Sequence, residues 1–130
     1  MKFREADIKD QVRLERMVEK EALQIFNNPD ARRGRDLETV KFFVRQGKVA
    51  ELYLIENHGY SEADKKYHDL KGEDGDYTEV KAYNNTPSSK VPYVQRDLQR
   101  YKGASWNISK WYILFNVNDG VYEFVDKIKI

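Results

Sequence analysis

The chain has 130 residues, of which 40% are hydrophobic, 35% charged and 13% aromatic. This balance is typical of one globular domain and excludes a disordered chain. The net charge of +1 indicates no particular partner. A nucleic-acid-binding protein of this net charge would need its basic side chains segregated from its acidic ones. The absence of cysteine excludes disulfides, thiolate zinc sites and cysteine nucleophiles. With only two histidines, a metal site or acid–base pair built from histidine is not favoured.

The sequence shows no sign of membrane insertion or export. No apolar run approaches the length of a membrane span, and the first five residues lack the apolar stretch of a signal peptide. We therefore expect a protein without membrane contact, located in the cytoplasm.

The first half of the chain predicts two amphipathic helices. The first covers residues 9–26 and ends at the turn-forming residues 27–30. A basic loop, Arg32-Arg33-Gly34-Arg35, follows it. Asp36 is a suitable N-cap for the second helix, which reaches residue 57 and either breaks at Gly47 or continues through it.

The second half predicts strands around one further helix. Two strands within residues 65–83, joined by a turn at 72–76, would form a β-hairpin, and a helix runs over 92–101. The apolar run 111–117 predicts a central strand, joined by a turn at Asn118-Asp119-Gly120 to a closing strand at 121–130. These elements predict a single α/β domain over 1–130, a mixed β-sheet flanked by helices.

The predicted hairpin contains the residues with the clearest chemistry. Side chains alternate along a strand, so Glu79 and Lys81 share one face while Val80 points into the core, and pairing brings Asp69 beside them. Neighbouring carboxylates repel unless a cation lies between them, and Mg²⁺ suits such a pair. Lys81 can orient a water molecule or stabilise developing negative charge. Alternatively, Glu-x-Lys is a solvated surface with a weak ion pair.

A further acidic residue precedes the hairpin. Glu51 lies close to the apolar stripe of the second helix, between Val49 and Leu52. A charge at such a position needs a partner or a metal ion, unless the side chain extends to solvent.

Taken in order, Glu51, Asp69 and Glu79-Val80-Lys81 resemble the PD-(D/E)xK nuclease superfamily, over roughly residues 47–117. The resemblance implies a restriction-endonuclease-like or Holliday-junction-resolvase-like fold and a divalent-metal-dependent endonuclease that hydrolyses DNA. It further implies a Mg²⁺ site, which Mn²⁺ also fills, formed by Asp69, Glu79 and the Val80 carbonyl. Lys81 would be the family's catalytic lysine, and Glu51 its helix Glu, a catalytic residue and a further ligand to the metal.

Two positions depart from the family pattern. His68 stands where the family usually has a proline before the Asp. Its candidate roles are a group that supports a metal ligand, a minor acid–base partner or an ordinary strand residue, and we expect the last. The RecB-like branch has a Gln four residues before a Tyr, whereas this chain has Asp97 before Tyr101. The sequence therefore does not favour that branch.

Basic and aromatic side chains near the motif are candidates for contacts with DNA. Tyr93 and Trp106 are candidates for stacking on bases, although core packing is the more ordinary role for Trp106. The candidate phosphate contacts are Arg32, Arg33, Arg35, Lys48, Lys90 and Arg96.

Several alternatives remain open at this point. The chain can instead be a catalytically inactive nuclease-fold protein that binds DNA or inhibits another protein, or a structural protein with a fortuitous motif. The form of DNA cleaved, RNA as a substrate and any sequence specificity are undetermined. A homodimer is expected, since cutting two strands needs two sites and C₂ symmetry matches their opposed polarity. The small size is compatible with a phage origin, which would place the protein in the host cytoplasm.

Overall fold

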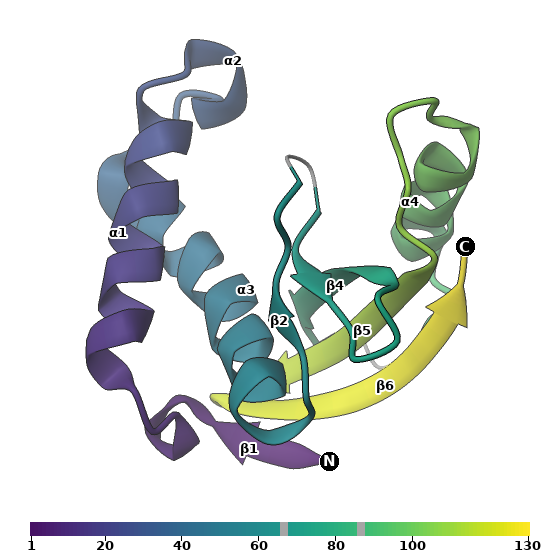
Figure 1. Cartoon of the computed structure of the whole chain (residues 1–130). Helices are drawn as coiled ribbons and strands as arrows, with labels where there is room; N and C mark the ends of the chain where they lie inside the picture. The colour runs from purple at the N-terminus through teal and green to yellow at the C-terminus, as the bar shows by residue number, and fades with distance from the viewer. Residues whose placement is uncertain (66–67, 86–87) are drawn as a thin grey trace.

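A computed structural model describes residues 1–65, 68–85 and 88–130 and confirms the α/β class (Figure 1). Within these residues, one mixed sheet of six strands has the order β1-β6-β5-β4-β3-β2. Strands β4 and β5 run parallel, and every other neighbouring pair is antiparallel. No helix in this part of the chain combines the length and apolarity needed to cross a bilayer.

The helices are α1 (Gln11–Phe26), α2 (Pro29–Arg32), α3 (Leu37–Asn57) and α4 (Pro92–Gly103), with a 3₁₀ turn at Glu5–Asp7. The strands are β1 (Lys2–Arg4), β2 (Ser61–Glu62), β3 (Leu70–Lys71), β4 (Tyr77–Asn84), β5 (Trp111–Asn118) and β6 (Val121–Lys129).

The two long helices begin at side-chain caps. The Asp10 carboxylate accepts a hydrogen bond from Arg13 N at 2.9 Å, and the Asp36 carboxylate accepts one from Thr39 N at 2.7 Å. Gly47 lies inside α3, which is continuous across it. Both predicted N-terminal helices are therefore confirmed, because capping and helical spacing are local properties of the sequence.

The predicted hairpin over 65–83 is present only in part. Strand β3 contains just Leu70 and Lys71, which pair with Thr78 and Tyr77 of β4. The expectation of a strand over 65–71 was wrong in extent, and residues 66–67 lie outside the described part. The chain instead pairs Ser61 with Lys71 through the short strand β2.

The C-terminal hairpin follows the prediction. Strand β5 lies between β4 and β6, as expected for the most apolar run of the chain. The turn residues Asp119 and Gly120 have φ of 50° and 74°, the positive values that a two-residue type I′ turn requires. Strand β1 was not predicted, since a three-residue edge strand is too short to show alternation.

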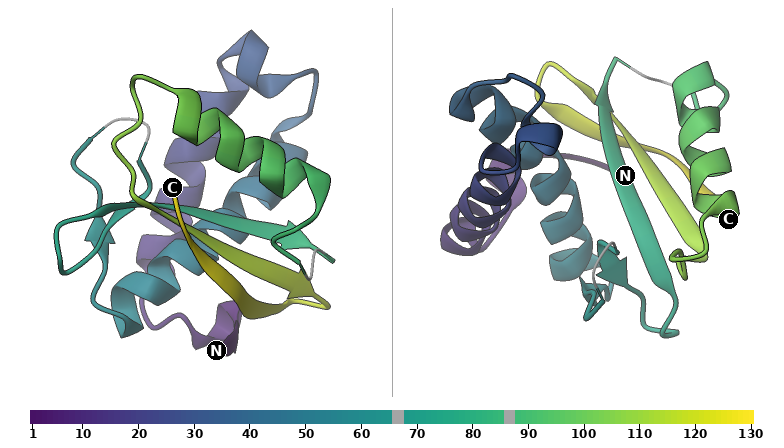
Figure 2. Two further views of the ribbon diagram at one scale, coloured as in Figure 1. Left: turned by 90° about the vertical axis from the view of Figure 1, so that its right-hand side faces the viewer. Right: turned by 90° about the horizontal axis from the view of Figure 1, so that it is seen from above.

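Helices cover both faces of the sheet (Figure 2). Helices α1 and α3 pack on one face against the buried side chains of Val80, Ile113 and Phe115. Helix α4 packs on the other face against Tyr112 and Leu114. Successive residues of β4 and β5 therefore face α3 and α4 in alternation.

The first helix and the last strand both pack against other parts of the chain. The apolar stripe of α1, with Leu14, Val18 and Ala22 fully buried, joins the same core as α3. Strand β1 pairs with the first residues of β6, at 121–123. The apolar stripe of α1 and the first part of the β6 edge are thus covered within the chain.

Candidate active site

The candidate site lies where β3 separates from β4. The ladder between them ends at the Leu70–Thr78 pair, and beyond it the Asp69 Oδ2 accepts a hydrogen bond from Val80 N at 2.9 Å. Because the N–H and C=O of one strand residue point to the same side, the Val80 carbonyl faces this opened edge as well. Asp69 and the Val80 carbonyl therefore meet at the edge of the sheet.

Glu79 points to the α4 face of the sheet and is 3% exposed. Its Oε1 accepts a hydrogen bond from Ser109 Oγ at 3.1 Å and lies 3.3 Å from His68 Nδ1. Burial, and next the neighbouring charge of Asp69, raise the pKa of Glu79 to about 8. A cation beside this carboxyl would favour its ionised form at neutral pH.

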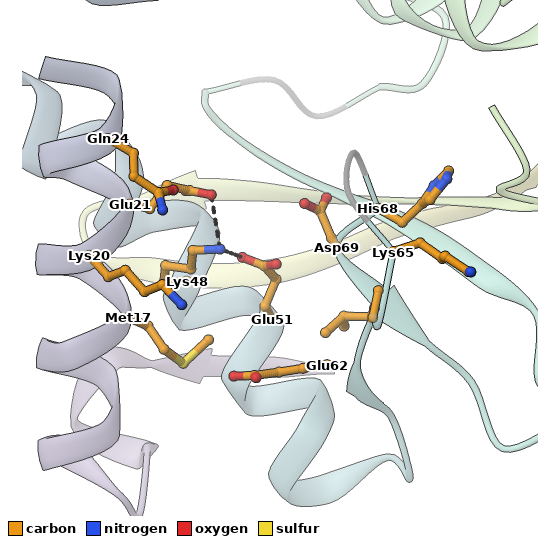
Figure 3. Close-up of a pocket in the computed structure, with 12 residues that line it drawn as sticks. Met17, Lys20, Glu21, Gln24, Lys48, Glu51, Glu62, Lys65, His68 and Asp69 are labelled. Atoms are coloured by element: carbon orange, nitrogen blue, oxygen red, sulfur yellow. Dashed lines mark ion pairs between the residues drawn. The ribbon is translucent and has the colours of Figure 1, made fainter. Parts of the chain in front are cut away.

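Glu51 approaches from α3, on the opposite face, and is 5% exposed. Its Oε2 lies 3.1 Å from Lys48 Nζ, which also lies 3.2 Å from Glu21 Oε1 of α1 (Figure 3). Burial and the charge of Asp69 raise the pKa of Glu51 well above its usual range, against the opposing effect of Lys48. Glu51 is thus a buried acid with one positive neighbour.

Lys81 follows Glu79 on the α4 face and is half-buried. Burial opposes its charge, but the neighbouring Tyr101 and Asp69 outweigh it, so the pKa of Lys81 is raised. Beside it, the Tyr83 hydroxyl donates a hydrogen bond to Asp97 Oδ2 at 2.7 Å. Lys81 is therefore a charged ammonium group held close to the acids.

Asp69 connects these groups across the sheet. Its charge contributes to the raised pKa of Glu51 on one face and of Glu79 and Lys81 on the other. We expected Asp69, Glu79 and Lys81 to share one face. In the structure, Asp69 lies just before β3, beyond the last pair of the ladder between β3 and β4, and its carboxylate lies at Val80 N.

The oxygen atoms at the site are of the type that a magnesium ion prefers as ligands. Mg²⁺ prefers oxygen ligands and needs only one or two protein carboxylates, because it keeps several waters. Asp69, Glu79 and the Val80 carbonyl supply such oxygens, and the raised pKa of Glu79 is what a nearby cation would reverse. Across the described residues, however, no three His, Asp or Glu side chains are arranged to hold a metal ion.

Ser109 was not identified from the sequence, and His68 was assigned the wrong role. The His68 ring is buried, and its Nδ1 lies 2.6 Å from Ser109 Oγ, so the expectation of an ordinary strand residue was wrong. Ser109 lies after α4, where its backbone N–H donates a hydrogen bond to Asn107 Oδ1 at 3.0 Å. No local signal marks it, because its partner Glu79 is 30 residues away.

Two arginines of the basic loop hold the loop together. Arg32 Nε donates to the Arg35 carbonyl at 2.8 Å, and Arg35 Nε donates to the Arg32 carbonyl at 3.0 Å. The Arg32 guanidinium also lies 3.7 Å from the centre of the Phe26 ring. Arg33 is exposed, with a left-handed backbone of φ 54°. Among the three, Arg33 is therefore the best placed to contact a phosphate.

The remaining candidates for DNA contact divide into two groups. Lys48 is 14% exposed in its side chain and is engaged by Glu21 and Glu51. Lys90 and Arg96, near the start of α4, are exposed. Trp106 is 43% exposed, so core packing was the wrong expectation for it.

A cavity of about 360 Å³ opens beside the acids, between α1 and the segment that leads into β3. Figure 3 shows Glu51 and Asp69 facing each other across it, with Lys20 and Gln24 of α1 on its far wall. Glu51 and Asp69 are thus reached through a polar opening on the α1 side, which Glu79 does not line.

No family model matches the chain, and no curated protein matches it. Its function therefore has to be inferred from the site.

Proposed function

We propose that this protein is a divalent-metal-dependent endonuclease of the PD-(D/E)xK type, which hydrolyses phosphodiester bonds in DNA. The observation that carries the proposal is the position of Asp69. It lies at an opened sheet edge, beside the buried acid Glu79 and near the charged Lys81, with Glu51 on the other side. This agrees with the order Glu51, Asp69, Glu79-Val80-Lys81, in which the chain resembles that superfamily.

In this proposal Mg²⁺, for which Mn²⁺ substitutes, is held by Asp69, Glu79, the Val80 carbonyl and Glu51. When bound, the ion supplies a water of lowered pKa and neutralises charge on the scissile phosphate. Lys81, as an ammonium group, orients the attacking water and stabilises the negative charge that develops on the phosphate. The Ser109 hydroxyl fixes the orientation of the Glu79 carboxyl through its hydrogen bond.

The arrangement of the helices offers a place for DNA. In Figure 1, α2 and α4 stand on opposite sides of the opened β4 edge, and the view from above in Figure 2 agrees. Arg33 follows α2, and Lys90 and Arg96 lie near the start of α4. Basic side chains therefore flank an acidic centre, the segregation that a nucleic-acid-binding protein with a net charge of +1 needs.

A second candidate is a nuclease-fold protein that binds DNA without cleaving it. It is favoured by the engagement of Glu51 with Lys48, and by the lack of a ready three-ligand metal arrangement in the described residues. Clustered acids facing DNA phosphates weaken binding, so a protein that only binds DNA gains nothing from them.

Cleavage of end-labelled DNA separates the two candidates. Linear duplex, single-stranded and four-way-junction oligonucleotides are incubated with Mg²⁺ and, in parallel, with EDTA. We expect cleavage of at least one of them with Mg²⁺ and none with EDTA. Binding of the same DNA with no cleavage in either condition would instead establish the second candidate.

Arg33→Ala is expected to weaken DNA binding without destabilising the loop. Losing one phosphate contact should lower the salt dependence, the slope of log K against log [salt], by about 0.9. Lys2, on β1 at the other end of the molecule, is the matched control, and Lys2→Ala should leave the slope unchanged. The slope is measured by fluorescence anisotropy in Ca²⁺ or EDTA. An unchanged slope for Arg33→Ala would show that the loop does not contact DNA.

A further inference from the structure

Lys48 occupies a position that the proposed chemistry does not use. Its ammonium group lies between two carboxylates, 3.1 Å from Glu51 Oε2 and 3.2 Å from Glu21 Oε1. Its side chain is 14% exposed, which leaves little of it to meet a DNA phosphate. In Figure 3, Glu51 lies between Lys48 on one side and Asp69 on the other. Lys48 therefore neutralises the acidic centre from the α3 side.

The ion pair with Glu21 brings α1 into the site. Helix α1 lies outside the segment that carries the resemblance, yet it places Glu21 against Lys48 and lines the cavity beside Glu51. Glu21 is 43% exposed in its side chain, whereas that of Glu51 is 6% exposed. The ammonium group of Lys48 thus has one partner inside the site and another at its rim.

We propose that Lys48 is a positioning residue, the internal counter-cation of the acidic centre, and that its ammonium group competes with a divalent cation for Glu51. This inference rests on the proposed metal site. Without a metal ion, Lys48 compensates the buried charge of Glu51, which is costly if unpaired. With a metal ion, the two cations repel, and Glu21 provides the place to which the ammonium group moves. Glu21 and Lys48 together therefore set how tightly the site binds its metal.

The test is the affinity for Mn²⁺ alone, measured by isothermal titration calorimetry without DNA. Removing the competing cation in Lys48→Met should tighten Mn²⁺ binding about tenfold, similar in size and opposite in sign to the loss caused by removing a supporting outer-shell partner. Lys20 of α1 lines the same cavity and is exposed. Lys20→Met is the matched control for through-space charge and should change the affinity no more than about twofold.

A double-mutant cycle tests whether Glu21 acts through Lys48. Glu21→Gln should weaken Mn²⁺ binding, because Lys48 then has only Glu51 as a partner. In the Lys48→Met background the same change should have no effect, and Lys48→Arg should remain close to the wild type. Circular dichroism confirms that each variant is folded, and Glu21→Gln, at the rim, keeps the test available if Lys48→Met does not fold.

The outcomes separate this inference from the proposed function. A wild-type protein that binds no Mn²⁺ would overturn both. A wild-type protein that binds Mn²⁺, together with a Lys48→Met variant of equal or weaker affinity, would overturn the role of Lys48 alone. An effect of Glu21→Gln that persists without Lys48 would show that Glu21 acts directly on the metal ion, which also overturns the inference.

Discussion

Replacing Lys81 with Met is expected to slow DNA cleavage about 10²–10³-fold, the usual cost of removing one group that stabilises transition-state charge. Lys81 lies near Asp69 and Tyr101 on the α4 face, and its raised pKa keeps it charged at neutral pH. Because it is not one of the proposed metal ligands, Mn²⁺ should bind the variant at least as tightly as the wild type. The loss should appear as a lower kcat and not as a higher KM.

The control for this change is Lys129→Met, at the exposed end of β6. It removes the same charge from an exposed side chain two strands away from β4 and should cleave at the wild-type rate. Single-turnover rates with saturating Mg²⁺ provide the comparison. Removing a group that stabilises transition-state charge costs about 10²–10³-fold in rate. A Lys81→Met variant that retained more than about a tenth of the wild-type rate would therefore show that Lys81 has no such catalytic role.

The second large effect is on stability. In EDTA, Glu79→Gln is expected to stabilise the protein at pH 7 by on the order of 3 kcal/mol, because a folded-state pKa of about 8 makes the ionised Glu79 carboxyl costly. Burial and the charge of Asp69 raise the folded-state pKa of Glu79 from its ordinary 4.5. Between these values the folded state binds more protons than the unfolded state, so the wild type loses stability as pH rises. Gln carries no such charge.

The signature of this effect is its pH dependence. The free energy of unfolding of the two proteins, from urea titrations, should coincide near pH 4 and diverge progressively up to about pH 8. Glu123→Gln, on the exposed part of β6, should show no comparable divergence. A Glu79→Gln variant less stable than the wild type throughout this range would show that Glu79 stabilises the fold through its hydrogen bond with Ser109 instead.

The helices and the C-terminal hairpin could be predicted because their signals are local. Asp10 and Asp36 cap the helices from positions three residues before the amides they bind. The Asp119-Gly120 turn and the apolar run of β5 likewise depend on neighbouring residues alone. The alternation Glu79-Val80-Lys81 correctly placed the acid and the lysine on one face and the valine in the core.

Features that depend on distant residues could not be predicted in this way. The separation of β3 from β4 moves Asp69 to the sheet edge, and nothing in the local sequence marks where a ladder ends. The contacts of Ser109 with Glu79, and of Lys48 with Glu21, join elements 30 and 27 positions apart. Lys48 was a candidate DNA contact from the sequence, whereas the structure pairs it with Glu21 and Glu51.

The most direct test of the central claim is a plasmid-nicking assay with the wild type and Asp69→Asn, purified in parallel. Asp69 links the acids on both faces of the sheet, so its loss should remove the site while leaving an isosteric side chain at Val80 N. We predict that the wild type converts supercoiled DNA to open-circular or linear DNA with Mg²⁺ and not with EDTA, and that Asp69→Asn does neither. Equal nicking by the two proteins, or no nicking by the wild type with Mg²⁺ or Mn²⁺, would contradict the account.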